Sequence, residues 1–322
     1  MPGTATLSEI GERAVIAALT AELATAPDVL VGPGDDAAVL DVGGPVVTSV
    51  DVLVENVHFK LGWSDPGDIG RKAVAVNVAD LEAMGARATG IVLGFSAPPH
   101  LQLRWVRELA VGLRAECAAA GVSLLGGDVT RSRDLTLSVT VLGGLEGRAP
   151  VLRSGARAGD VVALRGRTGW AAAGLAVLSR GFRSPRAVVE AQKVPQVPYG
   201  EGAVAARAGA TAMVDVSDGL VSDLAHVAEA SGVVVDLRRD AFEVPEPLQA
   251  VAAATGADPY QLLLTGGEDH ALAATFPAGT VPAGWREVGL VRALGADEPA
   301  QVLVDGQTWA SPGGHDHFGP AR

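Results

Sequence analysis

Hydrophobic and polar residues follow one another along the first half of the chain in patterns that predict both helices and strands. Apolar side chains recur at helical spacing at Leu7, Ile10, Ala14 and Ala17, which predicts an opening amphipathic helix. Apolar stretches that alternate or run without a break predict strands at residues 37–40, 46–54, 89–96 and 135–143. The segments between them predict helices over residues 68–84 and 101–120. This mixture indicates an α/β domain.

A second α/β domain is predicted after a stretch that is punctuated by Pro150, Gly155 and Gly159. Beyond it we expect strands at residues 160–164, 211–216 and 233–237, and helices at residues 170–179 and 220–230. A Val-Asp-Val strand end occurs in both halves, at residues 50–52 and 214–216, which hints at a duplicated architecture. We therefore expect an N-terminal domain over residues 1–148 and a C-terminal domain over residues 149–322.

Composition and hydropathy indicate the cellular location that is expected of the protein. Its 322 residues are enough for two domains, and 48% of them are hydrophobic. The mean hydropathy is +0.28, yet no apolar run approaches the roughly 20 residues of a membrane-spanning helix. The start of the sequence lacks the basic and apolar blocks of a signal peptide. We therefore expect a soluble, cytoplasmic protein without a membrane partner.

Charge and cysteine content argue against nucleic-acid binding and against disulfide or cysteine zinc sites. The formal net charge of −12 argues against a nucleic-acid partner, because phosphate backbones are bound by basic surfaces. Cys117 is the only cysteine, so an intrachain disulfide and a cysteine zinc site are excluded, which fits a reducing compartment. An acidic protein that binds phosphorylated small molecules needs local cations, and the sequence favours metal ions for this purpose.

The candidate chemistry lies in aspartates that stand beside glycines near predicted strand ends and helix starts. Carboxylate oxygens are the ligands that Mg²⁺ prefers, and glycine lets the backbone approach a phosphate closely. Four of the motifs also have a structural interpretation: a turn at Gly34-Asp35-Asp36, a helix N-cap at Asp215–Gly219, and a strand exit at residues 126–128 and 266–269. The set consists of Asp35, Asp36, Asp51, Asp80, Asp128, Asp215, Asp218, Asp223, Glu268 and Asp269.

Asp80 is the hardest of these to explain by structure alone. On a helix over residues 68–84 it shares one narrow face with Ile69, Ala73 and Val76, so its carboxylate is expected to be at least half buried. A buried carboxylate needs a cation or several donors. We favour a metal over an ion pair with a distant arginine.

Familiar catalytic signatures are absent. The sequence has no P-loop, protein-kinase set, Gly-x-Ser-x-Gly elbow or His-Glu-x-x-His helix, and its six histidines are scattered singly. No residue is a candidate covalent nucleophile.

The motifs nevertheless occur in one order along nearly the whole chain. They are Gly32-Pro33-Gly34-Asp35-Asp36, Val50-Asp51, His58-Phe59, Arg71-Lys72-Ala73, Asn77-Val78-Ala79-Asp80, Gly126-Gly127-Asp128, Arg153-Ser154-Gly155, Asp215-Val216-Ser217-Asp218-Gly219, Gly266-Gly267-Glu268-Asp269 and Gly314-His315-Asp316-His317-Phe318. From about Glu9 to Phe318 this ordered set resembles the thiamine-monophosphate kinase family. The resemblance implies transfer of the ATP γ-phosphoryl group to thiamine monophosphate. It also implies a two-domain fold like aminoimidazole ribonucleotide synthetase, with N-terminal domains that pair into a homodimer.

The resemblance also assigns roles to residues. It implies metal ligation by Asp36, Ser49, Val50 (through its carbonyl), Asp51, Asp80, Asp128, Asp215 and Asp218. It implies ATP contacts at Gly127, Asp128, Arg153 and Ser217, and substrate contacts at His58, Glu268 and His315. Position 50 is often threonine in the family, and position 315 is typically aromatic with Trp or Tyr, so this chain departs from the pattern at both.

The mechanism expected from this set is direct in-line transfer with several Mg²⁺ ions. The acceptor is already a phosphate oxygen, so a strong general base is not required. One ion cannot offset the negative charge of ATP, the substrate and six aspartates, so at least two are expected. The alternatives are another ATP-dependent enzyme of the same fold, whose catalytic Cys or Sec this chain lacks near its start, and a non-catalytic nucleotide- or metal-binding sensor.

Overall fold

The structure of the chain, a computed structural model, describes residues 4–23, 26–34 and 37–309. It divides into two compact units. The first unit consists of Met1–Leu81 and Ala86–Arg148, and the second of Glu82–Gly85 and Ala149–Arg322.

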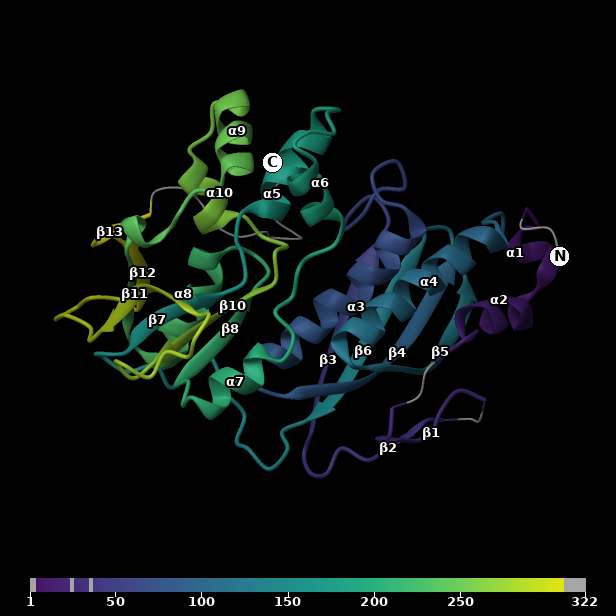
Figure 1. Cartoon of the computed structure of the whole chain (residues 1–322), viewed down its shortest axis with the longest axis horizontal. Helices are drawn as coiled ribbons and strands as arrows, with labels where there is room; N and C mark the ends of the chain where they lie inside the picture. Colours follow the sequence, from purple (N-terminus) through teal and green to yellow (C-terminus); the bar gives the residue numbers. More distant parts are fainter. Residues whose placement is uncertain (1–3, 24–25, 35–36, 310–322) are drawn as a thin grey trace. The chain divides into compact units, whose positions relative to one another are not determined.

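A four-stranded sheet forms the centre of the first unit, in the order β3-β6-β4-β5. Only β4 and β5 run parallel, and the helix α4 connects them. Helices α3 and α4 lie across one face of this sheet (Figure 1). The prediction of a strand at residues 46–54 is confirmed at both ends, and the predicted helices are confirmed to within two residues. The bounds are β3 (Val46–Val54), β4 (Arg87–Ala97), β5 (Ser123–Arg131), β6 (Thr136–Gly144), α3 (Pro66–Ala83) and α4 (Leu103–Ala120).

The opening helix differs from the prediction. It is interrupted at Gly11, whose φ of 75° lies in the left-handed region that glycine adopts without strain. The chain therefore forms two short helices, α1 (Leu7–Ile10) and α2 (Glu12–Leu19), in place of one. The expectation of a single helix was wrong because side-chain periodicity does not register this backbone break.

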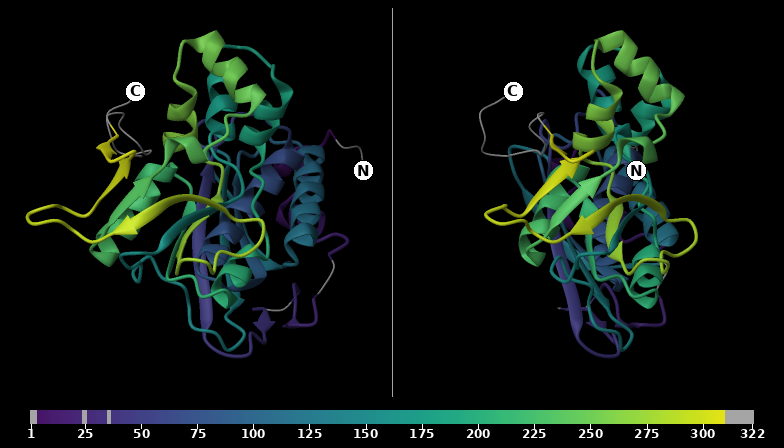
Figure 2. Two further views of the ribbon diagram at one scale, coloured as in Figure 1. Left: turned by 60° about the vertical axis from the view of Figure 1, so that its left-hand side comes forward. Right: turned by 90° about the vertical axis from the view of Figure 1, so that its left-hand side faces the viewer.

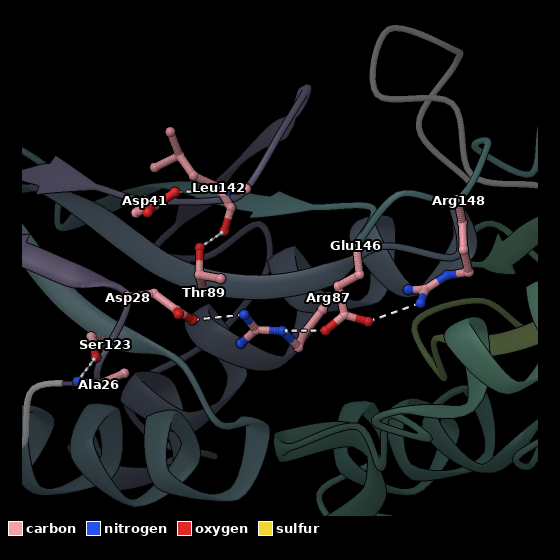
Figure 3. Close-up of polar contacts among 10 residues, drawn as sticks. Ala26, Asp28, Asp41, Arg87, Thr89, Ser123, Leu142, Glu146 and Arg148 are labelled. Atoms are coloured by element: carbon pink, nitrogen blue, oxygen red, sulfur yellow. Dashed lines mark hydrogen bonds and ion pairs between the residues drawn. The ribbon is translucent and has the colours of Figure 1, made fainter.

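A small hairpin of β1 (Val29–Val31) and β2 (Val39–Leu40) is held to the four-stranded sheet by polar contacts (Figure 3). Arg87 on β4 contacts Asp28 at 2.6 Å and Glu146 at 2.9 Å, and Arg148 contacts the other oxygen of Glu146 at 2.8 Å. The hydrogen bond to Asp28 raises the pKa of the Arg87 guanidinium, and the contact with Glu146 adds to this effect. Burial acts in the opposite direction, but the pKa is raised on balance. The ion pair between Arg87 and Asp28 therefore attaches the start of the hairpin to β4.

The second unit is built on a seven-stranded sheet in the order β13-β12-β9-β11-β7-β10-β8. Strands β7, β8 and β10 are almost wholly buried, and Phe276 packs edge-to-face on Trp285 in its core. The strands predicted in this half are confirmed to within one residue at each end. The bounds are β7 (Val161–Arg165), β8 (Ala212–Val216), β9 (Val234–Leu237), β10 (Ala271–Phe276), β11 (Arg286–Arg292), β12 (Gln301–Val304) and β13 (Gln307–Thr308).

Four helices of the second unit gather into one cluster beyond its sheet, as both views of Figure 2 show. They are α5 (Trp170–Ser179), α6 (Arg186–Lys193), α9 (Glu246–Thr255) and α10 (Pro259–Thr265). Helix α8 (Leu220–Ser231) packs instead against β8, β9 and β12.

The last two residues of α3, Glu82 and Ala83, belong to the second unit, where Glu82 is bound to the backbone of another helix. Its carboxylate oxygens accept hydrogen bonds from Gly200 N at 2.7 Å and Gly202 N at 2.8 Å, at the start of α7 (Glu201–Arg207). Burial raises the pKa of Glu82. A carboxylate at a helix N-terminus satisfies amide groups that have no partner within the helix.

Two further observations concern accessibility. Cys117 on α4 is 7% exposed, and burial raises the pKa of its thiol to about 12. Within the described residues, every helix is too short or too polar to span a lipid bilayer.

Candidate functional site

A first group of predicted ligands lies in the first unit, between β3 and α3. Ser49 and Asp51 are two residues apart on β3 and therefore point to the same face of the sheet. Ser49 Oγ donates to Asp80 Oδ2 at 2.6 Å, and Asp51 N donates to Asn77 Oδ1 at 2.9 Å. Asn77 is itself held by donating to Ala73 O at 2.8 Å. The structure therefore brings Ser49, Asp51 and Asp80 together, as the sequence predicts.

Val50 lies between Ser49 and Asp51 but points its side chain to the opposite face, where it is 55% exposed. Its side chain is therefore no part of this group. A role in metal binding is open only to its carbonyl, and that role stays a prediction.

Gly127 and Asp128 lie on β5, where glycine is required. A Cβ at position 127 would meet Leu93 O of the neighbouring strand at 1.9 Å, so only glycine fits this close approach. The register pairs Gly127 with Leu93 and Asp128 with Gly94. Asp128 is exposed at this point of the strand.

His58 follows β3 in a tight turn that fixes its imidazole. Val54 N donates to His58 Nδ1 at 3.0 Å, and Lys72 Nζ donates to His58 O at 3.0 Å. Since a nitrogen that accepts a hydrogen bond carries no proton, the neutral ring has its proton on Nε2. Lys72, only 2% exposed, holds the turn from α3, and the sequence motifs assign it no role.

A second group of acidic residues lies in the second unit, where β8 leads into α8. Asp223, in the first turn of α8, accepts hydrogen bonds from Asp218 N and Gly219 N, both at 3.0 Å. Burial raises the pKa of Asp223 to about 7, and the charge of Asp215 adds to this effect. His270 Nδ1 lies 3.2 Å from Asp215 Oδ2.

The segment around Glu268 is joined to the same turn by its backbone. Glu268 N donates to Ser217 O at 2.7 Å, and a Cβ on Gly267 would meet Ser217 O at 2.4 Å. Glu268 adopts a φ of 69°, a left-handed conformation that costs a non-glycine residue free energy. The structure thus brings Asp215, Ser217, Asp218 and Glu268 together.

Asp269 is a buried neighbour that the motif interpretation left without a role. It is 2% exposed, and its Oδ1 accepts a hydrogen bond from Ala171 N at 3.0 Å, at the start of α5. Burial raises the pKa of Asp269 to about 7. Arg167 stacks over Trp170 at 4.8 Å, and burial lowers the pKa of its guanidinium. In the sequence, the only local sign of this cluster is the pair of glycines, Gly166 and Gly169, that flank Arg167 and Thr168 directly before α5.

Arg153 is placed at a distance from the second group. Leu152 O accepts a hydrogen bond from Met213 N at 3.0 Å, so the Arg153 backbone lies beside the start of β8. Ser217 follows the other end of that strand, about 13 Å further along at roughly 3.3 Å per residue. The two predicted ATP contacts of the second unit are therefore not adjacent.

Two predicted site residues, Asp36 and His315, lie outside the described residues. Within the described ranges, no three His, Cys, Asp or Glu side chains are grouped closely enough to hold a metal ion by themselves.

Comparison with known proteins identifies the family. Residues 34–145 match the model of AIR synthase related protein, N-terminal domain, and residues 157–280 match that of the C-terminal domain. The chain is 49% identical over 316 residues to a thiamine-monophosphate kinase of Mycobacterium tuberculosis, which covers 98% of this chain and 93% of that protein. A thiamine-monophosphate kinase of Corynebacterium glutamicum is 38% identical, with 97% and 95% covered.

The chain belongs to the thiamine-monophosphate kinase family.

Solved structures of this kinase family agree with the assignment. Thiamine monophosphate kinase from Aquifex aeolicus superimposes with a TM-score of 0.76 at 29% identity, over 82% of this chain and 88% of that chain. AaThiL complexed with AMPPCP and TMP gives a TM-score of 0.78 at 30% identity, over 85% and 87%. Hydrogenase maturation protein HypE, with a TM-score of 0.70 at 22% identity, shares the fold alone.

Membership in this kinase family makes the chain an enzyme, and it confirms the expected fold class. The two halves carry the N- and C-terminal domains of AIR synthase related proteins. The chemistry of the donors fits Mg²⁺, which is usually held by one or two carboxylates together with phosphate oxygens. Both acidic groups contain hydroxyl and carboxylate oxygens. Burial first, and then the charge of Asp215, raise the pKa of Asp223, and a divalent cation relieves repulsion between carboxylates of this kind.

Proposed function

We propose that the chain phosphorylates thiamine monophosphate to thiamine diphosphate at the expense of ATP. The observation that carries this proposal is the arrangement of acidic side chains in two groups on the scaffold of a kinase family, with a relative 49% identical along nearly the full chain. The structure related at 30% identity that contains AMPPCP and TMP supports the same pair of substrates. Membership of the same family argues against the other ATP-dependent enzymes of this fold and against a non-catalytic sensor.

The two acidic groups are proposed to hold several Mg²⁺ ions. In the first unit the ligands are Ser49, the Val50 carbonyl, Asp51, Asp80 and Asp128, with Asp36 outside the described residues. In the second unit they are Asp215 and Asp218. When bound, magnesium supplies the positive charge that the phosphates of ATP and substrate require.

The remaining residues are proposed to position the reactants for direct in-line transfer. Arg153, Ser217, Gly127 and Asp128 contact the nucleotide, and His58 and Glu268 contact thiamine monophosphate. His58 presents its Nε2–H, because its Nδ1 is engaged by Val54 N. No side chain has to remove a proton from the acceptor, which is a phosphate oxygen.

We also propose that the protein is a cytoplasmic homodimer that pairs through the first unit. Strand β3 is an edge strand, and on one face it exposes Val46 (57%), Val50 (55%) and Val52 (44%). A long edge strand with exposed valines is unfavourable in a monomer and is suited to pairing with a second copy.

The direct test is ADP formation with and without thiamine monophosphate. We expect ADP to appear only with the substrate, and Asp80→Asn to reduce turnover at least about a hundredfold while the protein stays folded. Asp41→Asn is the matched control, because Asp41 is exposed and its carboxylate accepts a hydrogen bond from Gly43 N at 3.0 Å. A rate of ADP formation that is the same with and without thiamine monophosphate would contradict the proposal.

The number of ions is tested in the same assay. ATP carries about four negative charges and the substrate about two at neutral pH, in addition to the aspartates. We therefore expect the rate to keep rising with free Mg²⁺ after all ATP is present as MgATP. A flat response would show that one ion, brought with ATP, is sufficient.

A further inference from the structure

The segment of Arg153 to Ala156 has no regular secondary structure, yet a single hydroxyl group holds its backbone. Ser231 Oγ accepts hydrogen bonds from Gly155 N at 3.1 Å and Ala156 N at 3.2 Å, and it donates to Arg153 O at 3.2 Å. A serine hydroxyl has one proton and two lone pairs. The proton and both lone pairs of the Ser231 hydroxyl therefore all form hydrogen bonds with this segment.

The segment is also fixed from its other side. Gly155 has a φ of 131°, and a Cβ at this position would meet Thr211 O at 2.3 Å. Leu152 O, directly before Arg153, accepts a hydrogen bond from Met213 N at 3.0 Å. Strand β8 and Ser231 thus hold the segment between them, and the backbone of Arg153 has little freedom.

The side chain of Arg153 is in the opposite situation. It is exposed, and its guanidinium makes no hydrogen bond or ion pair within the described part of the chain. The fixed backbone reduces the entropy that is lost when an anion is bound, and the guanidinium has no bond within the described part of the chain that it must give up first.

Helix α8 connects this segment to the other predicted nucleotide contact of the second unit. The helix starts at Leu220, directly after Ser217–Gly219, and its last residue is Ser231. Its 12 residues span about 18 Å at 1.5 Å per residue. One rigid element therefore follows Ser217 at its first turn and holds the Arg153 segment at its last.

We propose that Ser231 is a positioning residue for ATP binding, which acts by holding Arg153 at a fixed distance from the Ser217 turn. This inference rests on the proposed function, in which Arg153 contacts ATP. Ser231 itself does not touch the nucleotide.

Steady-state kinetics of Ser231→Ala, Arg153→Ala and the double variant test this proposal. Loss of the three hydrogen bonds frees the Arg153 segment, so we expect Ser231→Ala to raise the KM for ATP about five- to tenfold. The kcat and the KM for thiamine monophosphate should stay near the wild-type values, because the proposed ligands of the substrate are elsewhere. Ser231→Thr, which keeps the hydroxyl, should restore the KM for ATP.

The double variant separates positioning from general stability. If Ser231 acts through Arg153, the double variant has the same KM for ATP as Arg153→Ala alone, because interacting residues are not additive. Thr255→Ala is the matched control. It removes a hydroxyl that donates to Val251 O at 2.8 Å near the end of α9, and it should leave the KM for ATP unchanged.

Each of three results in the Ser231 and control variants would overturn the inference: additive effects in the double variant, an unchanged KM for ATP in Ser231→Ala, or an equal effect of Thr255→Ala. A fourth such result concerns Arg153 itself. If Arg153→Ala binds ATP normally while the wild type phosphorylates thiamine monophosphate, the inference fails and the proposed function stands. If the wild type does not phosphorylate thiamine monophosphate, the proposed function fails, and calorimetric MgATP binding by the same five variants still decides the role of Ser231.

Discussion

His58 is held by hydrogen bonds at its ring and at its carbonyl, and this allows its two nitrogens to be tested separately. Asparagine places an oxygen where Nδ1 accepts from Val54 N, whereas glutamine places a donor near the position of Nε2. We expect His58→Asn to keep its stability and to raise the KM for thiamine monophosphate about 10- to 100-fold, because the proposed hydrogen bond from Nε2 to the substrate is lost. His58→Gln should show the reverse balance, with lower stability and a smaller rise in KM.

Urea unfolding and substrate kinetics on both variants check this prediction. Equal KM values for the two variants would mean that Nε2 does not face the substrate.

Asp269 allows a prediction about pH and stability. Its ordinary pKa is 3.8, and burial raises it to about 7, so between these values the folded protein binds more protons than the unfolded chain. Stability due to this group is therefore fully present below about pH 4 and is lost as the pH rises toward about 7. In Asp269→Asn the oxygen that accepts from Ala171 N remains and the titrating group is gone.

We thus expect Asp269→Asn to gain stability relative to the wild type as the pH is raised from about 4 to about 7. Urea unfolding of both proteins across this range is the measurement. Parallel stability curves would show that Asp269 does not titrate in the folded protein.

The burial of a single residue could be predicted from the sequence where helical periodicity determines which face the residue lies on. The apolar stripe on α3 correctly predicted that Asp80 would be at least half buried. Its hydrogen-bond partner Ser49 lies 31 residues earlier in the chain, and no local pattern indicates that pairing. The same reason explains why His270 was left unassigned: its contact with Asp215 depends on the pairing of β10 with β8.

Individual elements were predictable where their pattern was long. Strand β3 is a nine-residue segment rich in valine, and it was predicted to its ends. The strands β10–β13 were not predicted, since they are short, or apolar on both faces, or separated by irregular turns. The roles of Asp36 and His315 stay predictions, because both lie outside the described residues.

The close approach of β5 to β4 at Gly127 gives a prediction at this scale. A methyl group there would overlap Leu93 O, so the strands have to separate and their hydrogen bonds weaken. We expect Gly127→Ala to lower the free energy of unfolding by about 1–3 kcal/mol and to weaken ATP binding. Gly62→Ala is the control in the same unit, since a Cβ there meets nothing within 4 Å. Thermal unfolding and calorimetric ATP binding measure both effects, and equal behaviour of the two variants would contradict the prediction.

At the scale of the whole molecule, the exposed edge strand β3 predicts how copies associate. We expect the wild type to sediment as a dimer, and Val52→Lys to sediment as a monomer at micromolar concentration, because a buried lysine opposes pairing at a strand edge. Leu290→Lys is the control, a lysine at a residue of β11 that is 52% exposed in the second unit. Its mass in solution should equal that of the wild type. A monomeric wild type would refute the proposed pairing.

The single cysteine has a practical consequence for experiments on this protein. Cys117 is buried, and with a thiol pKa of about 12 it contains almost no thiolate at neutral pH. Maleimide and iodoacetamide dyes react with thiolates, so the folded wild type should remain unlabelled. A cysteine placed at an exposed position such as Ser184 would then be the one reactive site, and fluorophores can be attached there without first removing the native thiol.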